Sequence, residues 1–243
     1  MNPLLRELLA LFLFSVVAQT ALGAPDNWTE RYDRLLKKYV TPGGVKYAAW
    51  KGNAGDLQEL RGVVDAIGTA NVDSMSKNDQ LAFYINAYNA WILNEALGKY
   101  PTKSVKDTFF TFFTGKRIKV AGQQTSFNAL EKETIRSRFG DPRIHFALNC
   151  ASKSCPPLLA GAFRGSNLES QMETLGRNFI NSSKGVNYQE GGKTAELTKI
   201  FDWYKDDFKD GPIAFINKRR SKPLPNDVKI SYQEYDWALN ETR

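Results

Sequence analysis

SMSKNDQLAFYINAYNAWILNEALGKYP, residues 74–101, is the stretch of sequence that decides the expected fold. Ser76 followed three residues later by Asp79 matches a capping box, and Pro101 marks the end of the helical pattern. Between these two signals, large apolar side chains occur on nearly every face of the helix. A helix that is apolar all round is buried among other elements. We therefore expect a central, buried helix around which the rest of the chain packs.

Two asparagines interrupt this apolar helix. Asn86 and Asn89 lie three residues apart, on one face. A buried amide that lacks a hydrogen-bond partner costs about 1–3 kcal/mol, so both side chains need specific partners. Two interpretations stay open: the amides tie down neighbouring loops, or they face a site and bind a ligand together with Arg143 and Asn149.

The sequence on either side of this helix predicts more helices than strands. Before it, helical spacing covers residues 27–40 and about 55–69, with a turn at 41–44 and a short extended piece at 45–50. After it, an edge strand and turn are expected at 117–127, and a helix at 126–139 that is capped by Ser126 or Asn128. A helix at 166–181 opens with a Ser166–Glu169 capping box. Two more helices at 197–208 and 211–220 and a strand or turn at 228–240 complete the expected elements. No internal repeat or long linker divides the chain. We expect one α+β domain over residues 24–243, mainly helical around a small sheet.

The segment PRIHFALNC, residues 142–150, alternates apolar and polar residues and predicts a strand. Successive side chains of a strand point to opposite faces. Arg143, His145 and Asn149 would then share one face, and Cys150 would point to the other, into the core. Cys155 follows a short loop, so it is free to turn back toward His145.

These residues are the candidates for chemistry, because the chain has one histidine and two cysteines, all within residues 145–155. A cysteine nucleophile needs a base and a group that orients the base. We assign Cys155 as the nucleophile with Cys150 as the second choice, His145 as the base and Glu131 as its orienting partner. A metal site is not expected, because one histidine and a C-x4-C pair do not match zinc-ligand spacing. No cofactor is expected either.

Two other states of the cysteines remain open. In an exported protein, two cysteines favour a disulfide, and closing so short a loop would stabilise the fold by about 2 kcal/mol. Alternatively, both are inert thiols.

Residues 1–23 have the layout of a secretory signal peptide: Arg6, an apolar run from Leu8 to Val17, and small residues up to Gly23. The mature protein is expected to be periplasmic or secreted. The net charge of +7 is scattered and accompanies no nucleic-acid-binding motif, so nucleic acid is not an expected partner. The expected ligand is a small molecule or a peptide, with weak association with anionic envelope components.

Three stretches, NDQLAFYINAYNA (78–90), DPRIHFALNCASKSCPPL (141–158) and YDWALN (235–240), resemble the bacterial and plant family of unknown function numbered 547. The resemblance implies a set of signature residues and no agreed activity. In this sequence they are Asn86, Asn89, Glu131, Arg143, His145, Cys150, Cys155, Asp236, Trp237 and Asn240. The order of elements also resembles, distantly, the papain and transglutaminase group, although the corresponding helix start, Asn78 and Asp79, has no cysteine.

The residues therefore support two functional hypotheses. The first is an exported thiol-dependent enzyme that acts on amide bonds or thiol-containing peptides. The second is a non-catalytic module that binds a ligand or a protein and uses the two cysteines as a structural disulfide.

Overall fold

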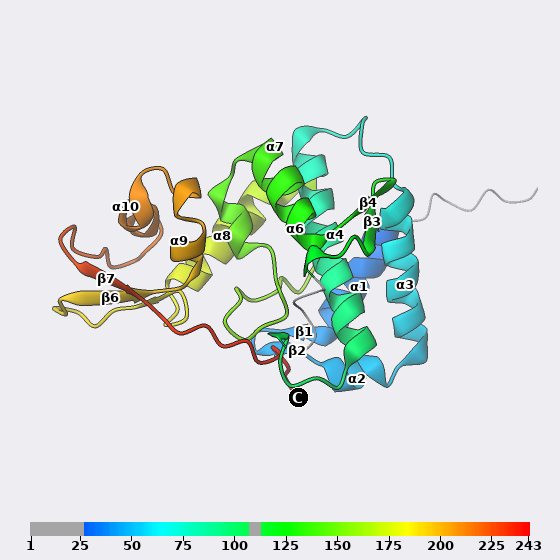
Figure 1. The fold of residues 1–243 in the computed structure, drawn as a ribbon, viewed down its shortest axis with the longest axis horizontal. Helices are drawn as coiled ribbons and strands as arrows, with labels where there is room; N and C mark the ends of the chain where they lie inside the picture. Colours follow the sequence, from blue (N-terminus) through cyan, green and yellow to red (C-terminus); the bar gives the residue numbers. More distant parts are fainter. Residues whose placement is uncertain (1–26, 107–112) are drawn as a thin grey trace, which may run out of the picture.

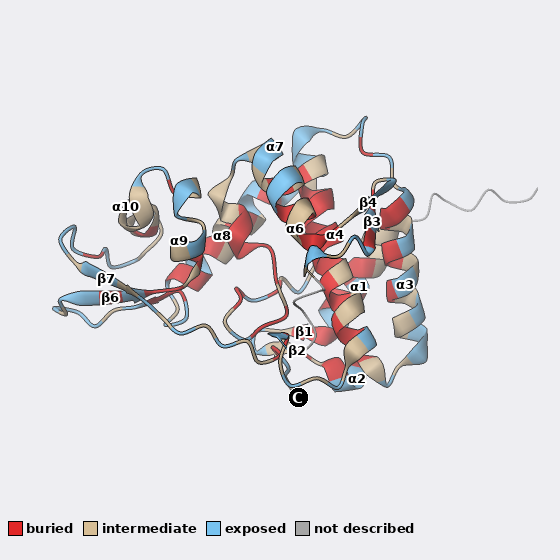
Figure 2. Ribbon diagram, viewed as in Figure 1, coloured by how far each residue is buried: buried red, intermediate tan, exposed pale blue. Residues whose placement is uncertain are grey.

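The central helix of the fold is α4 (Lys77–Lys99), which is buried as its sequence predicts. The computed structural model describes residues 27–106 and 113–243, so the signal peptide expected at residues 1–23 lies outside the described residues. Ser76 caps α4: its hydroxyl accepts the backbone N–H of Asp79 at 3.2 Å and donates to the Asp79 carboxylate at 2.6 Å. Figure 2 shows buried residues along α4 and the helices packed on it. The central helix and its Ser76 cap are both confirmed, although the Asp79 carboxylate binds the Ser76 hydroxyl and not its backbone N–H.

A hairpin and three helices precede α4 in the described part of the chain. They are α1 (Trp28–Tyr39), β1 (Val40–Thr41), β2 (Gly44–Val45), α2 (Tyr47–Lys51) and α3 (Ala54–Thr69). Helix α1 packs on α3, and α3 packs on α4. The extended piece expected at residues 45–50 is wrong beyond Val45, because Tyr47 and Trp50 are both fully buried. Two buried side chains three residues apart fit one face of a helix and not one face of a strand.

A second hairpin leads into the element that carries Glu131. Strand β3 (Ile118–Val120) pairs antiparallel with β4 (Gln123–Thr125). Ser126 then caps a continuous helical segment by accepting the backbone N–H of Ala129 at 3.1 Å. The segment consists of α6 (Phe127–Ala129), the π-helix η1 (Leu130–Arg136) and α7 (Ser137–Phe139). The predicted helix and its Ser126 cap are confirmed, but its middle is the wider π form, which occurs often at functional sites.

The strand predicted at residues 142–150 is wrong. Pro142–Phe146 form a short 3₁₀-helix, η2, and residues 147–159 follow as a loop. The Asp141 carboxylate accepts the backbone N–H of Arg143 at 2.9 Å, and a proline at the first helical position suits the φ angle of a helix. The apolar side chains alternate because Ile144 packs into one hydrophobic core and Phe146 into another. Strand parity therefore does not apply, and Cys150 does not point into the core.

The second half of the chain forms the other end of the molecule (Figure 1). Its helices are η3 (Gly165–Asn167), α8 (Leu168–Ile180), α9 (Ile200–Trp203), η4 (Lys205–Asp207) and α10 (Gly211–Asn217). Strand β6 (Thr194–Leu197) lies between β5 (Val186–Asn187), antiparallel to it, and β7 (Lys229–Tyr232), parallel to it. The capping box expected at Ser166 and Glu169 is wrong, because Ser166 lies within η3 and Glu169 pairs with Arg143.

After β7, the chain returns along the molecule to β1 and β2, as the red trace in Figure 1 shows. Isolated β-bridges join this tail to three earlier segments: Ser104 pairs with Ala238, Ser152 with Leu239, and Val45 with Glu241. The tail thereby brings Tyr235 and Trp237 beside the loop that holds both cysteines.

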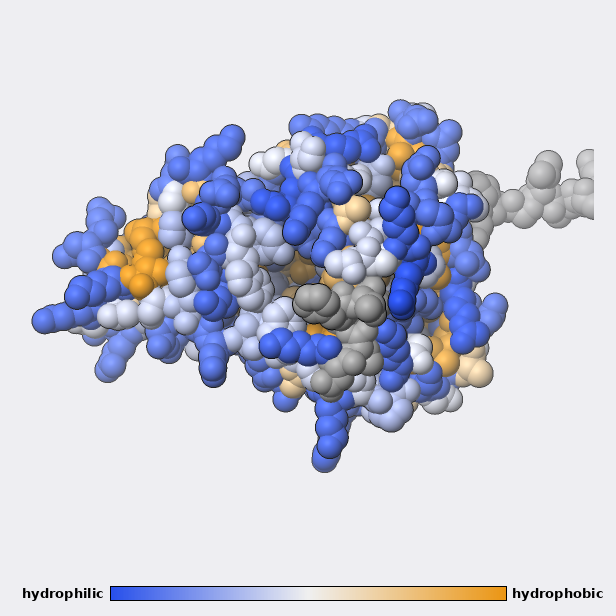
Figure 3. All heavy atoms as spheres, viewed as in Figure 1, coloured by the Kyte–Doolittle hydropathy of each residue, from blue (hydrophilic) through white to orange (hydrophobic). Residues whose placement is uncertain are grey.

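The chain is an α+β protein, mainly helical, as predicted. Two hydrophobic cores support it: a large one around α4, and a smaller one around Phe146, Phe201 and Phe208. Figure 3 shows a largely hydrophilic face, with hydrophobic patches at the end that carries β6, β7 and α10. Among residues 27–106 and 113–243, no helix combines the length and apolar character that a membrane crossing requires.

Candidate functional site

A cavity of about 460 Å³ lies where the two cores meet, and most of its wall is apolar. Its side chains come from elements far apart in the sequence. They include Tyr88 from α4, Glu131 from η1, His145 from η2, Cys150 and Cys155 from the following loop, Trp203 and Tyr204 from α9 and its end, and Tyr235 and Trp237 from the tail. The four residues predicted to carry chemistry, Cys155, Cys150, His145 and Glu131, all line this one cavity.

Cys150 and Cys155 are joined as a disulfide, with 6.2 Å between their Cα atoms. The sequence left three states open for the cysteines: a reactive thiol, a disulfide or two inert thiols. The structure contains the disulfide. Cys155 is 8% exposed, whereas Cys150 is only partly buried. Because the 142–150 segment is not a strand, both sulfur atoms face the cavity rather than opposite sides of a sheet.

Two donors point at the sulfur of Cys155. The backbone N–H of Cys150 lies 3.0 Å from Cys155 Sγ, and the Tyr235 hydroxyl lies 3.2 Å from it. The Ser152 hydroxyl donates to the Tyr235 oxygen at 3.0 Å, and burial raises the pKa of Tyr235 to about 12. Tyr235 therefore stays protonated at neutral pH and remains a donor. Donors of this kind stabilise a thiolate. The hydroxyls of Ser152 and Tyr235 also lie 3.2 and 3.3 Å from Cys150 Sγ, so the backbone N–H is the contact that distinguishes the Cys155 sulfur.

The predicted binding asparagines hold backbone in place. The Asn86 amide makes two hydrogen bonds to Phe163, at 2.8 and 2.9 Å. The Asn89 amide donates to the Ala147 carbonyl at 2.9 Å and accepts the backbone N–H of Asn149 at 2.9 Å. Neither asparagine is among the described residues that line the cavity. Their positions fit the interpretation that they tie down loops.

Asn149 holds the disulfide loop at both ends. Its side-chain oxygen accepts the backbone N–H of Ala151 at 2.9 Å, and its Nδ2 donates to the Pro156 carbonyl at 2.8 Å. Ala151 has a φ of 64°, in the left-handed region that few non-glycine residues adopt. The side chain of Asn149 is thus bound to the loop and not directed at a ligand.

His145 is positioned by Asp207 and Tyr204. Its Nε2 lies 2.6 Å from Asp207 Oδ2, and its ring stacks on Tyr204 with the centroids 3.9 Å apart. Arg136 binds the same carboxylate with two hydrogen bonds of 2.7 Å. Burial lowers the pKa of His145 to about 4 despite the carboxylate, whose charge Arg136 already balances. The imidazole is therefore neutral at physiological pH.

Asp207 was not predicted as a site residue. In the structure it makes the hydrogen bond to His145 that was expected of Glu131. It lies 62 residues after His145, and no local pattern links the two. The only signal was the acidic pair Asp206–Asp207 in a predicted helix.

Glu131 lies in the wall of the same cavity but is not hydrogen-bonded to His145 in the described part of the chain. It is 9% exposed, and its Oε1 is buried with no hydrogen-bond partner among the described residues. Burial raises the pKa of this carboxyl group, and a hydrogen bond with Tyr204 opposes that shift. An unpartnered carboxylate oxygen in an aromatic cavity needs a donor that a ligand can supply.

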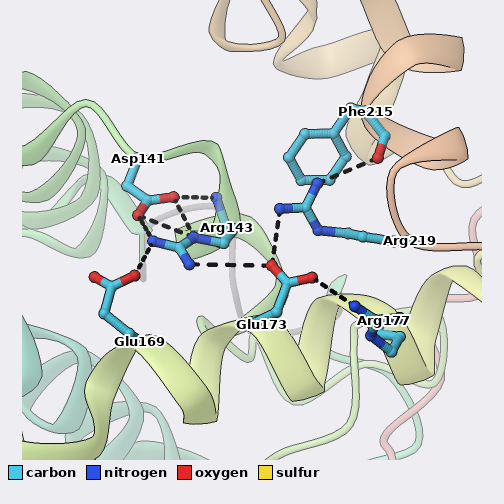
Figure 4. Close-up of polar contacts among 7 residues, drawn as sticks. All are labelled: Asp141, Arg143, Glu169, Glu173, Arg177, Phe215 and Arg219. Atoms are coloured by element: carbon cyan, nitrogen blue, oxygen red, sulfur yellow. Dashed lines mark hydrogen bonds and ion pairs between the residues drawn. The ribbon is translucent and has the colours of Figure 1, made fainter.

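Arg143, predicted as a binding residue, belongs to an ionic network outside the cavity (Figure 4). Its guanidinium binds Asp141 at 2.6 Å and Glu169 at 2.7 Å. Glu173, 4.0 Å from Arg143, also binds Arg219 at 2.9 Å. These carboxylates raise the pKa of Arg143 further. The network fastens η2 to α8 and, through Arg219, to α10.

Within the described residues, no group of three or more His, Cys, Asp or Glu side chains is arranged to hold a metal ion.

Residues 72–180 match the model of a family described as "Protein of unknown function, DUF547". The match covers α4, η1, η2 and the disulfide loop, so the resemblance seen in the sequence motifs is confirmed over this part of the chain. It ends before Asp207, Tyr235 and Trp237, which complete the cavity. No curated protein matches the chain, and no solved structure does.

Proposed function

We propose that this protein is a thiol-dependent enzyme that carries out thiol–disulfide exchange with a small thiol compound or a thiol-containing peptide. The observation that carries the proposal is the place of the Cys150–Cys155 disulfide, in the wall of a cavity that also holds a neutral histidine. A disulfide that serves only as a staple has no need of a cavity or of donors beside its sulfur atoms. Of the two predicted substrate classes, the thiol class fits the oxidised state, because an attack on an amide would first require reduction.

The first step is attack on Cys150, the more exposed of the two cysteine residues. A substrate thiolate forms a bond to Cys150 Sγ, the bond between the cysteines breaks, and Cys155 leaves as a thiolate. The backbone N–H of Cys150 and the hydroxyl of Tyr235 stabilise that leaving thiolate. In this scheme Cys155, first predicted as the nucleophile, is the leaving and resolving thiol.

The second step returns the substrate as a disulfide. Another thiolate attacks the substrate sulfur of the mixed disulfide and releases Cys150, so two substrate thiols give one substrate disulfide and two protein thiols. Exchange with a second low-molecular-weight disulfide reverses both steps and restores the Cys150–Cys155 bond. The substrate enters as a thiolate, because the lowered pKa of His145, which Asp207 holds through Nε2, makes the imidazole a weak proton acceptor.

Mixed-disulfide trapping tests this proposal. In Cys155→Ser, Cys150 should form a stable adduct with a small thiol supplied as its disulfide, visible by intact-protein mass spectrometry. The matched variant Cys150→Ser should react more slowly, because Cys155 is the more buried of the two residues. In the native protein, millimolar thiols should reduce the disulfide without unfolding the chain. If reduction occurs only after denaturation, the proposal is wrong.

That contrary result would favour the second candidate, a ligand-binding module with a structural disulfide. The observation in favour of this candidate is that the Asn149 side chain binds the residue after each cysteine, Ala151 and Pro156. Two results together would establish the binding module. The disulfide would resist reduction by thiols in the folded protein, and a ligand would raise the melting temperature of Cys155→Ser.

We propose that this chemistry takes place outside the cytoplasm, after cleavage of residues 1–23. A stable cysteine pair is typical of oxidising compartments. Cell fractionation with amino-terminal sequencing should find a mature chain that starts near Ala24 in the envelope or the medium. A full-length chain in the cytoplasm would contradict this.

A further inference from the structure

The unused carboxyl group of Glu131 is the feature of the cavity that the exchange reaction does not explain. The group is more than nine-tenths buried, and Oε1 has no partner among the described residues. Arg136, a cation on the same element, makes two hydrogen bonds to Asp207 instead. Burial raises the pKa of Glu131, and the charges of Arg136 and Lys132 offset this rise only in part.

Aromatic rings make up much of the surrounding wall, including Tyr88, Tyr204, Tyr235 and Trp237. Trp203, Tyr235 and Trp237 form a continuous aromatic surface: the centroids of Trp203 and Tyr235 are 4.8 Å apart, and those of Tyr235 and Trp237 are 4.5 Å apart. The faces of such rings attract cations, and aromatic cavities with a carboxylate are typical of sites for organic ammonium groups.

The chain itself shows that this wall accepts an ammonium group. Lys106, another residue of the cavity wall, has its Nζ 5.4 Å from the centroid of the Trp237 ring. The guanidinium of Arg136 lies 5.2 Å from the centroid of Tyr204. Cations of the protein thus already contact two rings of the wall, whereas Glu131 Oε1 is left without one.

We propose that the substrate is an aminothiol, a small molecule that presents an ammonium group to Glu131 and the aromatic wall and a thiol to Cys150. This inference rests on the exchange function proposed above and names its substrate class. The ammonium group takes no part in the electron transfer; it is a charge that holds the substrate, while the sulfur follows the two exchange steps already described.

The matched substrates for the test are cysteamine and mercaptoethanol, which differ in an ammonium group against a hydroxyl group. The rate of reduction of the disulfide is measured for each in the native protein and in Glu131→Gln, after correction for the thiolate fraction of each thiol. We expect a preference for cysteamine in the native protein, and a loss of about tenfold in that preference in Glu131→Gln. Glu133→Gln, an exposed position on the same π-helix, should keep the preference.

A binding experiment that involves no sulfur separates the two proposals. Ethanolamine, which has the ammonium group of cysteamine but no sulfur, should quench the tryptophan fluorescence of the native protein, and ethylene glycol, which lacks the ammonium group, should quench it much less. If both thiols react equally and ethanolamine does not bind, the ammonium site is wrong although exchange stands. If neither thiol reduces the folded protein but ethanolamine binds in a manner that Glu131→Gln abolishes, the site stands and the exchange function is wrong.

Discussion

Tyr235 links the tail to the sulfur chemistry through a single hydroxyl group. That hydroxyl lies 3.2 Å from Cys155 Sγ and 3.3 Å from Cys150 Sγ. In Tyr235→Phe, the ring still packs against Trp237, but the Cys155 thiolate loses a donor. We expect the pKa of the reduced Cys155 thiol to rise and disulfide reduction to slow by about tenfold, since one hydrogen bond to a charged group is worth about 1.5–3 kcal/mol.

The measurement for Tyr235→Phe is the pH dependence of alkylation of the reduced protein by iodoacetamide. Tyr232→Phe is the control, because Tyr232 is 36% exposed on β7 and has no contact with either sulfur among the described residues. An alkylation profile that does not shift in Tyr235→Phe would show that the hydroxyl does not tune the thiol.

His145 makes stability depend on pH. Its pKa is lowered to about 4 in the fold, against about 6.5 in the unfolded chain. Below pH 6.5 the unfolded state binds the proton and the folded state does not, so stability is fully present above about pH 6.5 and falls as the pH drops toward 4. The loss approaches about 3 kcal/mol, at about 1.36 kcal/mol for each unit of pKa difference.

Urea unfolding at several pH values between 7 and 4 measures this loss. The chain has one histidine, so His145→Gln should remove the imidazole contribution altogether. The raised pKa of Glu131 acts in the opposite direction and is present in both proteins. If the free energy of unfolding falls equally with pH in the native protein and in His145→Gln, the imidazole is not held neutral.

At the scale of single residues, the sequence indicates a reactive side chain when its residue type is rare in the chain. His145, Cys150 and Cys155 stand out because the chain has so few of either kind, and they do line one cavity. Asp207 and Tyr235 are common residue types that lie 62 and 85 residues from the partners they contact. Only the tertiary fold brings them there, so no local pattern predicts them.

At the scale of elements, Asn86 and Asn89 fasten helix α4 to two different loops, which allows a paired test. Asn86→Ala frees the loop at Phe163, and Asn89→Ala frees the segment from Ala147 to Asn149. Each variant leaves buried backbone groups unpaired and should cost about 2–4 kcal/mol in the free energy of unfolding, from two lost hydrogen bonds.

Reduction of the disulfide distinguishes the two variants. Asn89→Ala should make the cysteine pair easier to reduce, because the loosened segment leads directly to Cys150. Asn86→Ala should leave the rate of reduction unchanged at equal stability. If both variants change that rate alike, the effect is a general one on the fold and not on the loop.

The contrast between α4 and η2 shows which elements a sequence predicts. Helix α4 is long, has a capping box and ends at a proline, so its local signals and its burial agree. The five residues of η2 alternate in polarity, and so short a pattern does not separate a strand from a turn of helix packed between two cores. The decisive feature was Asp141 before Pro142, a capping signal that outweighs the alternation.

At the scale of the whole molecule, Leu239 anchors the returning tail in the large core. This side chain is 4% exposed in the large core, and its neighbours in the tail carry the wall of the cavity. Leu239→Ala should cost about 2–5 kcal/mol and loosen the tail. Hydrogen exchange should quicken at the backbone N–H of Asn240, which is bonded to the Ala151 carbonyl at 2.9 Å.

Ile230→Ala provides the comparison, because Ile230 is 38% exposed on β7 and lies before the tail. Its effect on stability should be small, and exchange at Asn240 should keep its native rate. Unchanged exchange at Asn240 in Leu239→Ala would show that the tail is held by its backbone bridges alone.

The returning tail also sets an order of assembly. The cysteines are five residues apart, so they can meet as soon as their loop exists, whereas Tyr235 is separated from Cys150 by 85 residues. Contacts between neighbours in sequence form earlier than contacts that close long loops. A newly made chain should therefore pass through a stage in which oxidants in solution reach both cysteines freely. The aromatic wall covers them only later, when the tail is in place. Selectivity for a substrate would then be the last property that the folding protein acquires.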